Sequence, residues 1–376
     1  MSNQIKIKIS AVLLILLSAF SVFAQTPKPT ATPAAAVEEE GEVIRVNSRL
    51  VVVPVSVTDA AGQPILGLKA QDFRVAEESK SQEIAQVSDA EKVPLEIALL
   101  IDVSSSLNPL FKFQQETAAK FLQEVMRSED RASIFLIGEK SVLAQPRDTA
   151  QKTALTVRNF QTPGKSVTAT AFYDTVTAAT DYLRKNAPPR SRRVILVLSD
   201  GEDNFSIAVR TAEAKNYRDI DVNKLDGDEL NKIAARTDRL HRQAQTYVAK
   251  QLQNSDTVFY AVNPAGNSIK YNKISARAQT AMQTFSDQTG GTAFLPNFRS
   301  VSLKDNLQNS YNVKFNQETL TKIFRQLANE LQAQYLVQYY SESDFPNDKY
   351  VKLDVSLQQN ANKVRVRARQ GYFVKN

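Results

Sequence analysis

Three short segments of this chain combine carboxylates with hydroxyls. The first, residues 102–106 with the sequence Asp-Val-Ser-Ser-Ser, places a carboxylate and two hydroxyls at positions i, i+2 and i+4. The second is Thr-Ala-Thr at 168–170, and the third is Ser-Asp-Gly-Glu-Asp at 199–203. Carboxylate, hydroxyl and water oxygens are hard ligands that suit Mg²⁺. Together these segments predict a divalent-cation site, provided that the fold brings them together.

Both carboxylate segments follow apolar runs that are typical of buried strands. Residues 97–101 precede Asp102, and residues 194–198 lead into Asp200. In an open α/β sheet, ligands bind outside the carboxyl ends of the strands, where the strand order reverses. Taken singly, Asp102 could cap a helix and Ser-Asp-Gly could be an ordinary turn. The joint pattern favours a site, because two such strands would bring both aspartates to one edge if they are neighbours.

The alternation of apolar runs with helical patterns predicts the fold. Further apolar runs occur at 133–137 and 258–262, and 292–295 suits an edge strand. Helical patterns alternate with these runs, at 113–126, 171–184, 240–252, 276–289 and 318–332. Apolar strands separated by helices indicate a parallel sheet that is buried on both faces. We therefore expect an α/β fold with a doubly wound, mainly parallel, Rossmann-like sheet of about six strands.

In the segments that flank this α/β region, apolar and polar residues alternate, as they do in half-buried strands. Such patterns begin at Val43 and return at 334–340, 350–357 and 363–369. We expect them to meet in one sheet or sandwich, a smaller β-rich module. The predicted organisation is an N-terminal β module at 43–93, the α/β domain at 94–300, and a C-terminal helix and strands at 301–376 that pack with the N-terminal module.

Residues 205–239 interrupt the alternation of strand and helix patterns, and we expect them to be an insertion over one rim of the sheet. Residues 219–223 resemble a calcium loop faintly. However, Lys224 stands where the turn glycine belongs, and Leu230 stands where the bidentate carboxylate belongs. A solvated polar loop is the better interpretation.

The N-terminus has the pattern of an export signal. Lys6 and Lys8 precede an apolar run at 11–17, and Val22-Phe23-Ala24 offers small residues for a signal peptidase. We expect a signal peptide at 1–24 and a flexible Pro/Thr/Ala-rich spacer at 25–42. The run is short for a bilayer-spanning helix, which disfavours an uncleaved anchor. The mature protein would then be periplasmic or extracellular, with no integral membrane span.

Composition excludes several classes of function. The chain has no cysteine, which rules out disulfides, thiolate metal sites, a lipid-modified cysteine and a thiol nucleophile. The formal charge of +7, about +5 without the signal, is spread along the chain, and no basic stripe marks a nucleic-acid binder. Neither a Gly-x-Gly-x-x-Gly after the first strand nor a Walker sequence occurs, so nucleotide binding has no support.

The three segments resemble the von Willebrand factor type A (VWA) domain, in which Asp-x-Ser-x-Ser, Thr and Asp elements form the metal-ion-dependent adhesion site (MIDAS). The flanks, such as 53–59, 334–340 and 367–372, resemble a bacterial exported family called VWFA-related. The resemblance implies these metal ligands: Asp102, Ser104, Ser106, Thr170 and Asp200. Thr168 is a rival to Thr170, because the family usually places two glycines before its threonine. The cation implied is Mg²⁺ rather than Ca²⁺ or Mn²⁺, and the partner is a protein that contributes an exposed carboxylate.

Catalysis has little support in the sequence. An aspartyl phosphotransferase would want a second carboxylate at position 104, which is serine. The only histidine, His241, lies in a basic helical segment and is expected to face solvent, so a Ser/His/Asp triad is disfavoured. We expect a non-enzymatic, adhesion-type binding module. The alternatives are an envelope scaffold whose metal only stabilises the fold and, less favoured, an unrecognised hydrolase.

Overall fold

A computed structural model describes the chain at residues 48–89, 92–103, 111–160, 169–217, 220, 226–264, 273–299, 306–359 and 364–375. Within the chain, Val46–Asn376 forms one compact unit. None of the described helices combines the length and the apolar character needed to cross a bilayer.

The central sheet has six strands in the order β10-β9-β8-β5-β6-β7. Its strands are β5 (Leu95–Asp102), β6 (Arg131–Ile137), β7 (Val142–Asp148), β8 (Arg192–Leu198), β9 (Thr257–Val262) and β10 (Ala293–Phe294). All neighbours are parallel except β6 and β7, which are antiparallel. Every residue of β5 and β9 is buried, as expected of strands covered on both faces. The predicted doubly wound, mainly parallel sheet is therefore confirmed.

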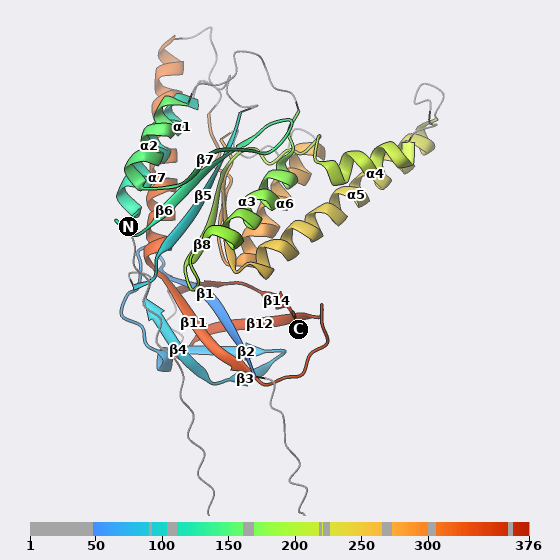
Figure 1. The fold of residues 1–376 in the computed structure, drawn as a ribbon. Coiled ribbons are helices and arrows are strands. Elements are labelled where there is room, and N and C mark those ends of the chain that lie inside the picture. Colours follow the sequence, from blue (N-terminus) through green and yellow to red (C-terminus); the bar gives the residue numbers. More distant parts are fainter. Residues whose placement is uncertain are drawn as a thin grey trace, which may run out of the picture. The chain divides into compact units, whose positions relative to one another are not determined.

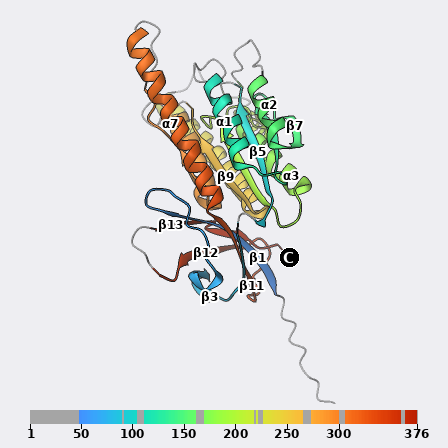
Figure 2. The same ribbon diagram turned by 90° about the vertical axis from the view of Figure 1, so that its left-hand side faces the viewer.

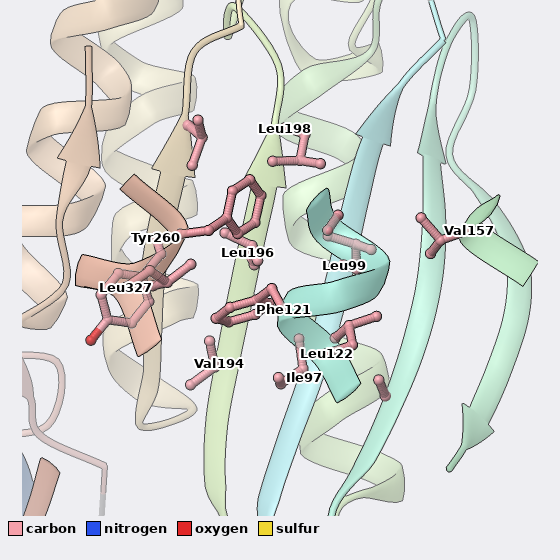
Figure 3. Packing of buried hydrophobic residues seen from close by; sticks show 14 of the residues in the cluster. Ile97, Leu99, Phe121, Leu122, Val157, Val194, Leu196, Leu198, Tyr260 and Leu327 are labelled. Atoms are coloured by element: carbon pink, nitrogen blue, oxygen red, sulfur yellow. The ribbon is translucent and has the colours of Figure 1, made fainter. Parts of the chain in front are cut away.

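Helices cover both faces of this sheet (Figures 1 and 2). One layer contains α1 (Phe111–Val125), α2 (Ala150–Asn159) and α7 (Asn306–Gln332). The other contains α3 (Phe172–Asn186), α5 (Gly227–Asn254) and α6 (Lys273–Thr289). Because side chains alternate along a strand, Leu99 packs under the first layer and Leu100 under the second. Figure 3 shows the first layer, where Phe121 and Leu122 of α1 lie over Leu99.

The flanking segments form a β sandwich of two four-stranded sheets, in the orders β13-β1-β11-β4 and β14-β12-β2-β3. The strands are β1 (Arg49–Asp59), β2 (Phe73–Glu77), β3 (Lys80–Gln82), β4 (Ile84–Asp89), β11 (Gln334–Ser341), β12 (Tyr350–Leu357), β13 (Val364–Ala368) and β14 (Gly371–Phe373), with a short 3-10 helix at Ala70–Asp72. The antiparallel pairing of β1 with β11 joins the two ends of the chain, which confirms the smaller β-rich module. Tyr335 and Tyr339 are buried and Tyr340 is exposed, as strand alternation predicts.

The sandwich is attached to the amino-terminal end of the central sheet (Figures 1 and 2). The Val57 amide donates to the Ala333 carbonyl at the end of α7. At the start of β8, Arg192 Nη1 donates to the Leu331 carbonyl over 2.8 Å. The first bond joins the sandwich to the end of α7, and the second joins α7 to the central sheet. The predicted domain boundaries stay a prediction.

Several elements differ from the sequence-based expectation. The helix expected at 240–252 is α5, which begins at Gly227 because Asp226 and Glu229 form a capping box. Together with α4 (Ile207–Tyr217) it makes a helical hairpin within the predicted insertion, which extends away from the sheet (Figure 1). The calcium-like segment 219–223 lies outside the described residues except for Ile220. The strand β7 and the helix α2 were not predicted, and α7 starts at Asn306 rather than near 318.

Candidate metal centre

Asp102 and Asp200 lie at the carboxyl ends of two neighbouring parallel strands. β5 and β8 pair in register from Leu95 opposite Arg192 to Ile101 opposite Leu198. The chain places β6 on one side of β5 and β8 on the other, so the strand order reverses here. This is the topological switch point, where open α/β sheets bind ligands. The fold thus brings together the two carboxylates that the sequence singled out.

Ser199 joins the two aspartate segments. Its Oγ donates to Asp102 Oδ2 over 2.6 Å, and the same Oγ accepts from the Gly201 amide at 2.9 Å. Both Asp102 and Ser199 are fully buried. Because a charge-assisted hydrogen bond is short and directional, Ser199 fixes the orientation of the Asp102 carboxylate.

The segment that carries Asp200 turns sharply at Gly201. Gly201 has a φ of +76°, and a Cβ there would meet Met282 side-chain atoms at 2.9 Å. Asp200 Oδ1 accepts from the Glu202 amide over 3.0 Å, which holds the carboxylate against its own turn. The positive φ therefore favours glycine, and a Cβ there would also displace the end of the Met282 side chain.

Thr170 is brought to the same edge by backbone hydrogen bonds. Its amide donates to Asn204 Oδ1 over 2.7 Å. Its carbonyl accepts from the amides of Asn204 and Phe205 at 3.0 and 3.1 Å. The threonine is 5% exposed. The hydroxyl-rich loop is thus tied to the segment that follows Asp200, although the two are distant in sequence.

Asp203 is a positioning residue that the sequence analysis did not identify. It is buried, and its Oδ2 accepts from the Tyr173 amide over 2.8 Å and from Ser206 Oγ. Tyr173 is in the first turn of α3, where helix amides lack partners and negative charge is favourable. Asp203 therefore caps a helix from another segment. No local sequence pattern reports such a cap, because its partner is about 30 residues away.

The electrostatics of this edge favour a cation. Burial, and then the neighbouring Asp102 carboxylate, raise the pKa of Asp200 to about 6. Burial also raises the pKa of Asp203, against the hydrogen bonds from Ser206 and Tyr173. Desolvation and a like charge both disfavour an ionised carboxylate. A bound cation would offset both effects at Asp200.

The remaining predicted ligands, Ser104 and Ser106, lie outside the described residues, as does Thr168. The choice between Thr168 and Thr170 therefore stays a prediction. In the described part of the chain, no group of three or more His, Cys, Asp or Glu residues could hold a metal. With two carboxylates on hand, a cation here would need hydroxyl and water oxygens as well. That donor set fits Mg²⁺ and does not fit a thiolate or imidazole metal site.

The expectation that His241 faces solvent is wrong. Its side chain is 3% exposed, and its ring lies edge-on to the Tyr173 ring with centroids 6.0 Å apart. Burial, with the nearby Arg277 charge, lowers the pKa of His241 to about 4. The basic residues beside it in sequence occupy other faces of α5, while His241 is on the face that packs against the α3 layer. It is therefore a neutral, packed histidine near neutral pH.

Comparisons with known proteins found likenesses to solved structures at low TM-scores. No protein-family model and no curated protein matches the sequence. Among solved structures, the SpRpn10 VWA domain is 13% identical with a TM-score of 0.36, over 58% of this chain and 95% of that one. An aerotolerance-related membrane protein from Bacteroides fragilis is 14% identical with a TM-score of 0.32, over 61% and 99%.

A third similar structure is proximal thread matrix protein 1 from the mussel byssus, described with a zinc-occupied MIDAS motif. It is 11% identical with a TM-score of 0.38, and the match covers 67% of this chain and 48% of that one. At these identities the likenesses concern the fold alone and assign no role to any residue.

Proposed function

We propose that this protein is a divalent-cation-dependent protein-binding module of the adhesion type. Its cation, Mg²⁺, would be held by Asp102, Ser104, Ser106, Thr170 and Asp200. The observation that carries the proposal is the meeting of Asp102 and Asp200 at the switch point, where the pKa of Asp200 is raised to about 6. Two close carboxylates, of which Asp102 is buried and Asp200 half-buried, suit cation binding.

The residues around the site have roles that follow from their contacts. Ser199 orients the Asp102 carboxylate, and the Asp200 turn is set by Gly201. Asn204 holds the backbone of Thr170 beside that turn. When bound, the cation would supply an open coordination position that the carboxylate of a partner protein completes. The chain's own residues therefore orient the ligands, with no proton transfer required of them.

We further propose that the protein works outside the cytoplasm and is not an enzyme. Export is supported by the signal-like segment at 1–24, which lies outside the described residues. A non-enzymatic role is supported by His241, the only histidine of the sequence, whose ring is buried against Tyr173. A panel of esterase, phosphatase and peptidase substrates tests this directly. Turnover that disappears in Asp102→Ala or Asp200→Ala would contradict a pure binding role.

Calorimetric titration of the purified protein with Mg²⁺ tests the site itself. We expect saturable binding that is lost in Asp102→Ala and in Asp200→Ala. Asp181→Ala is the matched control, since Asp181 is an exposed aspartate on α3 that pairs with Arg184. Titrations with Mn²⁺, Ca²⁺ and Zn²⁺ rank the affinities of the site for these ions. Unchanged Mg²⁺ affinity in Asp102→Ala would overturn the assignment.

Affinity capture from cells separates adhesion from a scaffold whose metal only stabilises the fold. For adhesion, a partner is retained with Mg²⁺ and lost with a chelator or with Asp102→Ala. For a scaffold, chelation lowers the melting temperature and leaves partner binding intact. A carboxylate on the partner is tested by neutralising its acidic residues one at a time.

A further inference from the structure

A second candidate site lies at the opposite end of the central sheet from Asp102 and Asp200. A cavity of about 120 Å³ lies between the sandwich and the amino-terminal end of β8 and β9. Strand alternation builds its apolar wall. One face of β1 and β11 lines the cavity while the other face fills the sandwich core; the lining members are Leu50, Val52, Pro54, Gln334, Leu336 and Gln338.

Three arginines, Arg190, Arg192 and Arg193, also line the cavity, and the last two lie on opposite faces of β8. Arg192 Nη1 donates to the Leu331 carbonyl, and Arg193 Nη1 donates to the Ser255 carbonyl over 2.9 Å. None of the three has an ion pair among the described residues. The one acidic residue in the lining, Asp256, is engaged by Arg369 Nη1 at 2.5 Å. The cavity therefore has a positive excess.

Two buried polar atoms of the lining residues lack hydrogen-bond partners within the described part of the chain. They are Arg193 Nε and Gln334 Oε1, and Gln334 is only 2% exposed. Leaving such atoms unsatisfied has a desolvation cost, so a bound molecule that pairs with them is favoured. The amide of Gln334 can present either its oxygen or its nitrogen to that molecule.

The mouth and the size of the cavity limit what can enter. Leu50 is 41% exposed and Arg190 is exposed, so the cavity is open to solvent on their side. Its volume is similar to that of the roughly 150 Å³ cavity known to hold a benzene molecule. A peptide or nucleotide is too large, and a bare inorganic anion would leave the apolar wall uncovered.

We propose that this cavity binds a small organic carboxylate with a compact apolar body, about the size of benzoate. The carboxylate would accept from Arg193 Nε and lie in the positive field of Arg190 and Arg192. The apolar body would cover Val52 and Leu336. Guanidinium groups recognise carboxylates through directed N–H donors, which is the unmet need of Arg193. This site is independent of the cation site.

The test is binding of benzoate to the full protein in the presence of EDTA, so that no metal can capture the carboxylate. We expect saturable binding, with shifts of the Val52 and Leu336 methyl resonances that locate it without any substitution. Acetate lacks the apolar body and benzyl alcohol lacks the charge, so each should bind about tenfold more weakly or worse. Equal binding of benzyl alcohol, or no saturable binding of benzoate, would overturn the proposal.

Substitutions in the cavity provide a second test of the proposal. Arg193→Gln should weaken benzoate binding about tenfold or more, and Val52→Phe should abolish it by filling the cavity. Arg184→Gln is the matched control, because Arg184 is an exposed arginine on α3. Retained affinity in both cavity variants, or methyl shifts away from the cavity in the wild type, would contradict the assignment. Mg²⁺ binding measured in the same samples reports separately on the proposed function.

Discussion

At the scale of single residues, the pKa values of Asp200 and His241 are shifted from their ordinary values in opposite directions. Burial is the leading cause for both, since it disfavours the charged form of each group. The pKa of Asp200 rises to about 6, and the pKa of His241 falls to about 4. The consequences for stability therefore have opposite signs and can be separated by substitution.

The metal-free protein should lose stability through Asp200 as the pH rises. The pKa of Asp200 is higher in the folded state than its usual 3.8, so its contribution is fully present below about pH 4 and is lost as pH rises through 6. The slope is at most about 1.4 kcal/mol per pH unit. Melting temperatures in EDTA from pH 4 to 7 should show this fall in the wild type relative to Asp200→Asn.

Mg²⁺ at pH 7 should recover this stability in the wild type and have little effect in Asp200→Asn, because the cation neutralises the carboxylate. Asp181→Asn, which alters an exposed aspartate, should follow the wild type. Parallel pH curves for the wild type and Asp200→Asn would contradict the prediction.

His241 should make the protein less stable as the pH falls. Its folded-state pKa of about 4 is below its usual 6.5, so the unfolded chain binds the proton more readily between these values. Stability is therefore lost as pH falls from about 6.5 toward 4, by at most about 1.4 kcal/mol per pH unit. Urea unfolding of His241→Gln against the wild type across this range is the measurement. An unchanged pH dependence in the variant would show that His241 is accessible to water.

At the scale of elements, the candidate metal centre depends on how three segments are held together. Ser199 links the ends of β5 and β8, and Asn204 links the Thr170 loop to the segment after β8. Asp203 then joins that segment to the start of α3. Two of the proposed ligands, Thr170 and Asp200, are on loops, and hydrogen bonds to Asn204 and to the Glu202 amide fix their positions.

Replacing Asp203 with Asn should weaken this arrangement without removing a predicted ligand. The variant keeps the size of the side chain and loses the charge that faces the Tyr173 amide and Ser206. We expect a loss of about 1–3 kcal/mol in unfolding free energy, since a buried, charge-assisted network is broken. Mg²⁺ affinity should fall as well, because the Thr170 loop is less well held.

Denaturant unfolding and Mg²⁺ titration of the same Asp203→Asn samples give both quantities. Asp181→Asn again serves as the control, with neither quantity expected to change. Wild-type Mg²⁺ affinity in a clearly destabilised Asp203→Asn would show that the cation does not depend on the Thr170 loop.

At the scale of the whole described unit, the two proposed sites occupy opposite ends of one sheet. The carboxyl ends of β5 and β8 carry Asp102 and Asp200, and the amino end of β8 carries Arg192 and Arg193. Strand β8 has seven residues, so the ends are roughly 20 Å apart at about 3.3 Å per residue. Sites separated by more than 7–10 Å without shared partners behave additively.

Arg193→Gln should accordingly leave the Mg²⁺ affinity unchanged, and Asp200→Asn should leave benzoate binding unchanged. A double-mutant cycle over both ligands should give a coupling free energy within about 0.5 kcal/mol of zero. Titration of the four proteins with each ligand measures it. A larger coupling would reveal communication along β8.

The fold was predictable from the sequence to the extent that its strands are apolar. The runs at 97–101, 194–198 and 258–262 became β5, β8 and β9 because strands buried on both faces are apolar throughout. The edge strand β7 was missed, since its exposed positions and Pro146 hide any pattern. The start of α5 was missed because the first half of that helix is mostly exposed and mixed in charge, so its few apolar residues mark no buried face.

For the candidate site, the sequence by itself determined which hard-oxygen residues follow which strands, because strand ends can be read from local pattern. Only the tertiary structure decided that β5 and β8 are neighbours, that Asp203 caps α3 and that His241 is buried. The tertiary structure also forms the cavity beside Arg193, which no sequence motif predicts. These features depend on contacts between segments that are distant in the chain, and local patterns carry no record of such contacts.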